Sequence, residues 1–195
     1  MGSLGEGRDP ERPGRDQALT TVDADGPENG QIAPRAPLLV LPLIKNNAPA
    51  RIVNVSSAGQ QPIDFDDVML TGGYSGARAY CQSKLAQIMF TIDLAGALKG
   101  TGVTVTCLHP ATYMDTSMVR RAGVRPLSTV EEGARAILNL ATSPAVAGRT
   151  GLYFNGLREA RAHAQAYDAD ARRRLQALSL ELTGLCAEDM VALAR

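Results

Sequence analysis

A tyrosine and a lysine four residues apart, Tyr80 and Lys84, are the residues of this sequence best suited to chemistry. Side chains at positions i and i+4 lie about one turn apart on the same face of a helix. A free phenol has a pKa of about 10, and a neighbouring ammonium favours the ionised form of a phenol. Such a pair can exchange a proton with a carbonyl or alcohol oxygen near neutral pH.

Two serines, Ser56 and Ser57, end an apolar segment that begins at Arg51. A serine hydroxyl can hold a substrate oxygen by a hydrogen bond, but either serine could instead cap the turn that leaves this segment. Alternation along a strand directs the two side chains to opposite faces. Asn54, inside the same segment, is expected to be structural.

The elements that position these residues alternate between strand and helix from Ala36 onward. β-Branched and apolar residues predict buried parallel strands at 51–56 and 103–108 and a short strand at 151–155. Helical periodicity and stop signals predict that residues 38–45 form the end of one helix. They predict further helices at 76–98, 128–140 and 168–182. This alternation predicts a parallel sheet with crossover helices.

The helix predicted from residue 128 begins with a capping signal. Ser128 and Glu131 have the Ser-x-x-Glu spacing of a capping box. Ala134, Ile137 and Leu138 are expected to face the core.

The ordered set of these motifs resembles the short-chain dehydrogenase/reductase family. The set comprises the strand that ends in Ser56-Ser57, the Tyr80-Cys-Gln-Ser-Lys84 motif, the strand from Val103, and His109-Pro110. The resemblance runs from about Ala36 to Leu185, and the residues around Tyr80 are most similar to the branch that includes retinol dehydrogenases. It implies an α/β Rossmann-like doubly wound parallel sheet.

The resemblance also implies an activity and its residues. Members of this family transfer hydride between a nicotinamide cofactor, NAD or NADP, and an alcohol or carbonyl. Catalytic roles would fall to Ser57, which holds the substrate oxygen, to Tyr80, the acid/base, and to Lys84. Cofactor contacts are implied for Tyr80, Lys84, Pro110, Ala111 and Thr116, and no metal is implied.

The sequence departs from the family at two points. The glycine-rich Thr-Gly-x-x-x-Gly-x-Gly turn that receives the cofactor pyrophosphate is not found in it. The segment His109-Pro110-Ala111 stands where the family usually has Pro-Gly. His109 itself is expected to be a packed residue.

Residues 1–35 differ in composition from the rest. They contain six glycines, four prolines and no aromatic residue, which predicts a disordered or non-homologous segment. We therefore expect an incomplete fold that lacks the N-terminal cofactor-binding half, a partial catalytic domain at 36–185 and a tail at 186–195. The rival hypothesis is a truncated, inactive family member that acts as a scaffold or interaction module.

Composition restricts the partners. The 20 basic residues balance 20 acidic ones, which argues against nucleic-acid binding. Cys81, Cys107 and Cys186 have no metal-ligand spacing and are odd in number, so a reduced, cytoplasmic location is expected. The longest apolar run, 38–44, is too short for a membrane span.

Two segments predict interactions. Residues 112–127 correspond to the family's substrate lid, and their apolar side chains, Tyr113, Met114, Met118 and Val119, suit a small hydrophobic alcohol or carbonyl. A docking surface for a partner would have the same sequence pattern. The helix at 76–98 matches a common subunit-contact helix of the family, which predicts a homo-oligomer.

Overall fold

The structure is a computed structural model that describes residues 18–22 and 35–184 of the 195-residue chain, with side chains from residue 40. Five strands form one sheet in the order β1-β2-β3-β4-β5. The strands are β1 (Ala18–Val22), β2 (Ala50–Val55), β3 (Val103–His109), β4 (Leu152–Asn155) and β5 (Arg158–Ala160). The first four run parallel, and β5 pairs antiparallel with β4.

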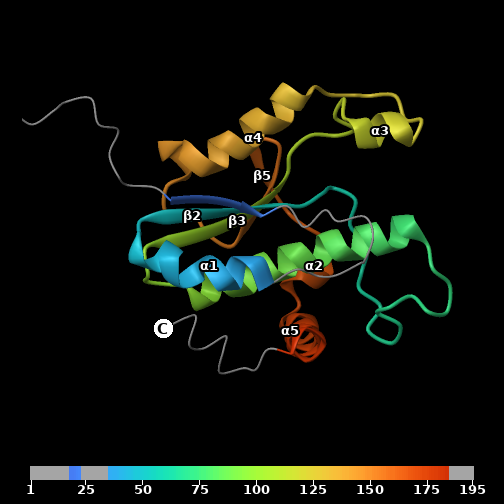
Figure 1. The fold of residues 1–195 in the computed structure, drawn as a ribbon, viewed down its shortest axis with the longest axis horizontal. Coiled ribbons are helices and arrows are strands. Elements are labelled where there is room, and N and C mark those ends of the chain that lie inside the picture. The colour runs from blue at the N-terminus through green and yellow to red at the C-terminus, as the bar shows by residue number, and fades with distance from the viewer. Residues whose placement is uncertain (1–17, 23–34, 185–195) are drawn as a thin grey trace, which may run out of the picture.

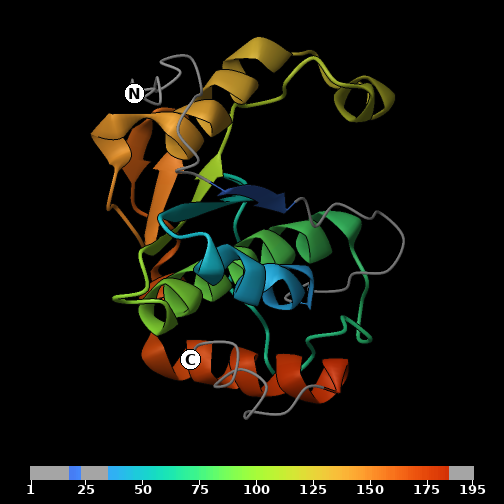
Figure 2. The ribbon, with the colours of Figure 1, turned by 60° about the vertical axis from the view of Figure 1, so that its left-hand side comes forward.

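Helices cover both faces of the sheet (Figures 1 and 2). On one face lie α1 (Arg35–Asn46) and α2 (Gly76–Ala97), with α5 (Ala169–Thr183) packed beyond α2, and on the other lies α4 (Val130–Thr142). The short helix α3 (Ser117–Arg121) lies on an arm away from the sheet. Two 3-10 turns, η1 (Pro144–Val146) and η2 (Ala164–Tyr167), complete the described elements. The predicted Rossmann-like α/β fold with a parallel sheet is confirmed.

Strand β2 shows why the core has two sides. Ile52 packs with the cluster of α1 and α2, whereas its neighbour Val53 packs with the cluster under α4. Successive side chains of a strand point to opposite faces, and both of these are almost fully buried. A strand that is apolar on both faces is the pattern of a parallel sheet covered on both sides.

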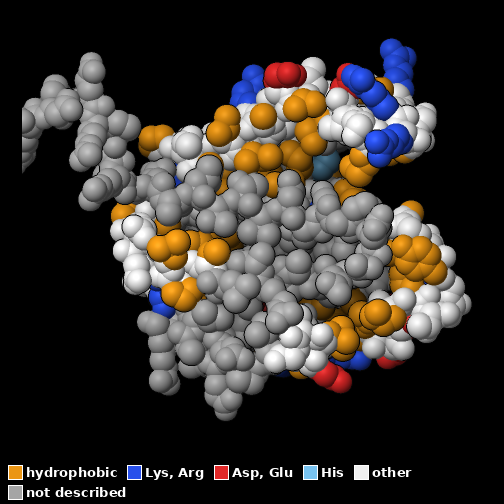
Figure 3. All heavy atoms as spheres, viewed as in Figure 1, with side chains coloured by type: hydrophobic (Ala, Val, Ile, Leu, Met, Phe, Trp, Pro, Cys, Tyr) orange, Lys and Arg blue, Asp and Glu red, His pale blue; other side chains and the backbone are white. Residues whose placement is uncertain are grey.

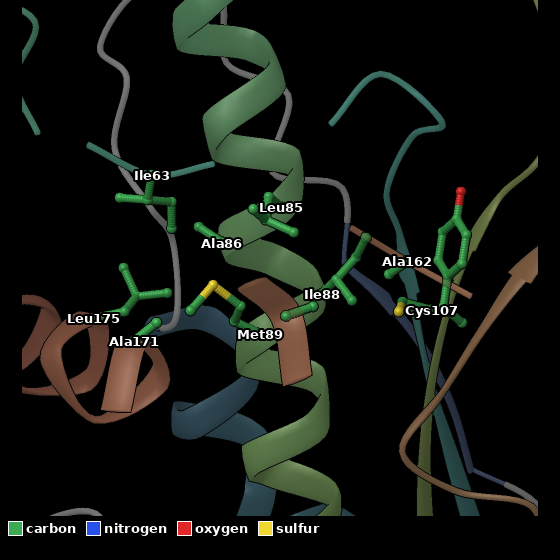
Figure 4. Packing of buried hydrophobic residues seen from close by; sticks show 11 residues of the cluster. Ile63, Leu85, Ala86, Ile88, Met89, Cys107, Ala162, Ala171 and Leu175 are labelled. Carbon is green, nitrogen blue, oxygen red and sulfur yellow. The ribbon is translucent and has the colours of Figure 1, made fainter. Parts of the chain in front are cut away.

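Helix α2 is the central helix on one face of the sheet. Its residues Leu85, Ile88 and Met89 are fully buried in a cluster that extends to Ala171 and Leu175 of α5. Figure 4 shows Met89 pointing from α2 toward these two α5 residues. Because α2 is buried between the sheet and α5, side chains at its N-terminal end have a fixed place relative to β2.

Two strands of the sheet were not predicted from the sequence. Strand β1 lies within residues 1–35, where disorder or unrelated sequence was expected, and it pairs with β2 through Thr20 and Ile52 among others. Strand β5 was not predicted, because its three residues, Arg158–Ala160, carry no apolar alternation. The remaining residues before Arg35 and the predicted tail at 186–195 lie outside the described residues.

The start of α4 lies one residue later than predicted. Thr129 is the N-cap, its hydroxyl accepts the Glu132 N–H at 3.1 Å, and the Glu132 carboxylate accepts the Thr129 N–H at 2.8 Å. Ser128 instead donates its hydroxyl proton to the carbonyl of Thr112. The buried residues of α4 are Gly133, Ala136, Leu140 and Ala141, whereas Ala134 and Leu138 are exposed and Ile137 is half-buried.

Candidate active site

The site lies where the carboxyl ends of β2, β3 and β4 meet. Strand β2 continues into Ser56, whose N–H donates to Leu108 O at 2.7 Å, and β3 continues into the buried Pro110. Strand β4 continues into Gly156, whose N–H donates to His109 O at 2.8 Å. This edge is where open parallel sheets bind ligands.

The two serines have different partners. Ser56 is buried, and its hydroxyl donates to the backbone carbonyl of Lys84 at 2.8 Å, which ties β2 to α2. The hydroxyl of Ser57 accepts the N–H of Gly59 at 3.0 Å. A hydroxyl has one proton and two lone pairs, so the proton of Ser57 is available to a further acceptor, whereas that of Ser56 is donated to Lys84.

Gly59 brings the site residues together. A Cβ placed on Gly59 would lie 3.5 Å from Ser57 Oγ, 3.6 Å from Tyr80 Cε1 and 3.5 Å from Cys81 Sγ. These are ordinary van der Waals distances, so the three side chains border the same small space beside Gly59. An oxygen atom of a substrate in this region could reach both Ser57 and Tyr80.

Lys84 lies one helical turn beyond Tyr80, on the sheet side of α2. Its side chain is buried, and its ammonium nitrogen is 3.4 Å from Val55 O and 5.5 Å from the centre of the Tyr80 ring. The Tyr80 side chain is 41% exposed. A buried cation therefore lies beside a phenol that a ligand can reach.

The residues expected to hold a cofactor lie in two places. Pro110 is buried and Ala111 half-buried, next to the end of β3 at the same sheet edge as Ser57. Thr116 lies on the arm, where it is the N-cap of α3 and its hydroxyl accepts the Val119 N–H at 3.4 Å. The sheet edge thus assembles most of the expected set, and Thr116 belongs to the adjacent arm.

His109 has the packing role expected for it. Its side chain is buried and its Nε2 lies 3.0 Å from the hydroxyl of Thr112. Burial lowers the pKa of His109 below its ordinary value, because desolvation penalises the charged imidazolium. Asn54 is likewise structural, since its buried amide donates to Thr91 of α2 at 2.8 Å.

The arm that carries α3 is closed at its base by backbone hydrogen bonds. Leu127 N–H donates to Tyr113 O, and Asp115 N–H donates to Ser128 O, both at 3.0 Å. Of the apolar side chains expected in this lid, Tyr113 and Met118 are exposed and Val119 is buried. Figure 3 shows a cleft between the arm and the lobe below it.

Two residues that contact the site were missed in the sequence. The hydroxyl of Tyr153 and the side-chain amide of Gln60 both donate to the backbone carbonyl of Ser57. Gln60 lies in a loop and Tyr153 in a short strand 96 residues beyond Ser57, so no local motif marks either of them.

Among the residues that the structure describes, no helix is long and apolar enough to cross a membrane. Within the same described part, no group of three or more His, Cys, Asp or Glu side chains could hold a metal ion.

Comparison with known proteins agrees with the geometry. Residues 36–125 match the family model described as short chain dehydrogenase. The chain is 36% identical over 165 residues to human retinol dehydrogenase 13, covering 75% of this chain and 50% of that protein. It is 38% identical over 162 residues to human retinol dehydrogenase 14, covering 75% of this chain and 48% of that protein. The chain thus spans about half the length of the curated relatives it matches.

A solved structure supports the fold. The crystal structure of an uncharacterized protein from Mycobacterium paratuberculosis superimposes with a TM-score of 0.52 at 24% identity, covering 76% of this chain and 55% of that one. The motifs of this chain, its match to the family model and its curated relatives all show similarity to the short-chain dehydrogenase/reductase family, and within it to retinol dehydrogenases.

Proposed function

We propose that the protein is an oxidoreductase that transfers hydride between a nicotinamide cofactor, NAD or NADP, and a hydrophobic alcohol or carbonyl. The observation that carries this proposal is the space beside Gly59, which Ser57 Oγ and the Tyr80 ring both border. The ammonium of Lys84, 5.5 Å from the ring centre, completes the arrangement.

The residues divide the proton chemistry between them. In reduction, the Ser57 hydroxyl donates a hydrogen bond to the substrate carbonyl oxygen, and the Tyr80 hydroxyl gives that oxygen its proton. The buried ammonium of Lys84 stabilises the phenolate that remains, because opposite charges attract strongly at a partly desolvated site. Oxidation of an alcohol uses the same residues in reverse. A bound nicotinamide supplies or accepts the hydride.

The residues present suit the nicotinamide end of such a cofactor. Pro110 and Ala111 would form one wall at the carboxyl edge of the sheet, with Tyr80, Lys84 and Thr116 as polar contacts. The glycine-rich turn for the pyrophosphate is not found in this sequence. On this proposal the described residues would orient the reacting ring, and none of them is assigned to the phosphates.

The arm supports a hydrophobic substrate. Tyr113, Met118 and Leu127 expose large apolar side chains there, and Figure 3 shows a cleft between the arm and the lobe below it. Retinol dehydrogenases, to which the chain is similar, are named for a long apolar alcohol. We therefore propose retinol-like alcohols and the corresponding aldehydes as the first substrates to test.

The proposal is tested by titrating the folded protein with NADH and NADPH, followed by nicotinamide fluorescence and heat of binding. Reduction of retinal is then measured with wild type and Tyr80→Phe, which keeps the ring and removes the hydroxyl. We expect saturable micromolar binding by both proteins and turnover by wild type only. Turnover that is equal in the two proteins would refute the role of Tyr80.

The alternative function is a non-catalytic interaction module. Under this alternative Ser57, Tyr80 and Lys84 keep their geometry without a hydride source, and α2 serves as a surface for self-association. A folded sample that binds neither cofactor, and sediments as a dimer, would support this function over the enzyme.

A further inference from the structure

The backbone carbonyl of Ser57 is held by two side chains from distant parts of the chain. The Tyr153 hydroxyl of β4 donates to this oxygen at 3.2 Å, and Nε2 of Gln60 donates to it at 2.9 Å. A carbonyl oxygen has two lone pairs, and these two donors satisfy both. Ser57 follows β2, yet its carbonyl bonds to side chains in place of a neighbouring strand.

Tyr153 is a fixed donor. Its ring is buried in the cluster of Cys107, Ala162 and Ala166. Burial raises the pKa of Tyr153 to about 12, so its hydroxyl stays protonated, and able to donate, throughout the range in which the protein would be assayed. The ring cannot swing away without disturbing this packing.

Gln60 is fixed by its second hydrogen bond. Its Oε1 accepts the N–H of His163 at 2.7 Å. Because an amide oxygen only accepts and an amide nitrogen only donates, this bond directs Nε2 toward Ser57. Gln60 thereby connects Ser57 to residue 163, between β5 and η2.

The orientation of this carbonyl is coupled to the Ser57 hydroxyl through the turn that follows. In this turn the Gly59 N–H donates to Ser57 Oγ at 3.0 Å. Rotation of the peptide after Ser57 would move the Gly59 N–H and break that bond, so that Oγ could turn to another rotamer and change its position relative to Tyr80. Misplacement of a reacting group by about 1 Å can lower turnover about 100-fold.

We propose that Gln60 and Tyr153 are positioning residues, which hold the Ser57 turn in the geometry needed for turnover and couple residues 153–163 to it. The catalytic part of this inference rests on the proposed oxidoreductase function. The mechanical part, that the two side chains hold the turn, concerns the structure alone.

Gln165 offers a matched control. Its Oε1 accepts the Ile63 N–H at 2.6 Å and its Nε2 donates to Ile63 O at 3.1 Å. Like Gln60, it makes two hydrogen bonds through its side-chain amide, and both join the loop after β2 to the region of η2. Gln60 makes one such bond, to His163, and one within the loop, to Ser57 O. Gln60→Met and Gln165→Met therefore remove the same number of side-chain hydrogen bonds, and only Gln60→Met removes one to Ser57.

The experiment compares Gln60→Met, Tyr153→Phe and Gln165→Met in the full chain. The first readout is retinal reduction with saturating cofactor. We expect kcat to fall about tenfold or more in Gln60→Met and Tyr153→Phe, with KM changed less than twofold, and kcat to stay within about twofold of wild type in Gln165→Met. Urea unfolding of each variant measures how much stability it has lost.

The second readout needs no turnover. Cys81 Sγ borders the same space beside Gly59 as Ser57 Oγ, whereas Cys107 is fully buried in β3. Iodoacetamide labelling, mapped by peptide mass spectrometry, should accelerate at Cys81 at least threefold in Gln60→Met and Tyr153→Phe, and not in Gln165→Met. Labelling of Cys107 reports global unfolding and corrects for it.

The two readouts separate the two hypotheses. If wild type shows no turnover, the oxidoreductase function fails, and the Cys81 labelling rates alone decide whether the turn is held. If Gln60→Met and Tyr153→Phe match Gln165→Met in kcat and in corrected Cys81 labelling, the positioning role is wrong.

Discussion

The ammonium nitrogen of Lys84 lies 5.5 Å from the centre of the Tyr80 ring, and the Lys84 side chain is buried whereas that of Tyr80 is 41% exposed. Lysine is almost never fully buried without partners, and here the Val55 carbonyl at the end of β2 accepts from it at 3.4 Å. The Tyr80 phenol is thus accessible from solvent, while the charge that would stabilise its anion lies inside the fold.

Replacement of this cation should separate catalysis from folding. Lys84→Met keeps most of the side-chain volume and removes the charge, so we expect kcat for carbonyl reduction to fall at least about 100-fold. The protein should remain folded, because replacing a buried charge by an apolar side chain is often neutral for stability. Steady-state kinetics and thermal unfolding of the same sample measure both effects.

Lys99 provides the control for Lys84→Met. It is exposed just beyond the end of α2, and Lys99→Met should leave kcat unchanged. An equal loss of activity in the two variants would show that charge in general, and not the position of Lys84, is responsible.

Side chains placed at Gly59 should block the space that Ser57 and Tyr80 share. The Cβ of Gly59→Ala would make ordinary contacts of 3.5 to 3.6 Å, and we expect about normal folding and modestly reduced turnover. The two methyl groups of Gly59→Val extend further into that space, so turnover should fall at least tenfold more than in the alanine variant. Kinetics of both variants, with thermal unfolding as a check on folding, test the location of the substrate oxygen.

The control for Gly59→Val is Gly96→Ala, in α2, where no atom outside the local helix lies within 4 Å of an added Cβ. Gly96 lies in the last turn of α2, so Gly96→Ala should change stability by at most about 0.5–1 kcal/mol, with unchanged turnover. If Gly59→Val retains full activity, the substrate does not approach beside Gly59.

The parts of the site that could be predicted are those with local signals. Strand β2 and helix α2 are long apolar or periodic segments, and each carries its functional residues at a fixed place in the sequence. Ser57 lies two residues beyond the end of β2, and Tyr80 and Lys84 share one face of α2. Strand ends and helix faces follow from periodicity, so the sequence was sufficient to bring these three residues together.

The remaining parts depend on tertiary contacts. Two overlapping capping signals, from Ser128 and Thr129, fit the sequence equally well, and Ser128 is excluded only because its hydroxyl donates to Thr112. Tyr153 is recognised as a donor to Ser57 only when β4 lies beside β3. Contacts between residues about 100 positions apart leave no periodic trace in one sequence.

His109 should make stability depend on pH. Burial lowers its pKa in the folded protein below the unfolded value of about 6.5. Between these two pKa values the unfolded state binds more protons than the folded state. The free energy of unfolding therefore has its full value, as far as His109 is concerned, above about pH 6.5, and it decreases as the pH falls through the unfolded pKa toward the folded one. Urea unfolding from pH 8 to pH 5 should show this slope in wild type, and His109→Gln should reduce it. An identical pH dependence in the two proteins would contradict the prediction.

Arg51 should stabilise the fold without contributing to the site. Its side chain is buried at the start of β2, and Nη1 donates to Leu140 O at 3.1 Å and to Ser143 O at 2.8 Å, at the C-terminal end of α4. Carbonyls at a helix C-terminus lack helical partners and favour a cation. Arg51→Met removes these donors, so we expect a loss of about 1–3 kcal/mol in the free energy of unfolding.

Urea denaturation of Arg51→Met beside Arg158→Met, a change at an exposed position of β5, measures this loss. Ser57 lies at the opposite end of β2 from Arg51, so cofactor binding by the folded fraction should match wild type. Equal unfolding midpoints in the two variants would mean that water replaces the guanidinium at the end of α4 at no cost. A selective loss of cofactor binding in Arg51→Met would instead show that the packing of α4 on β2 affects the geometry of the site.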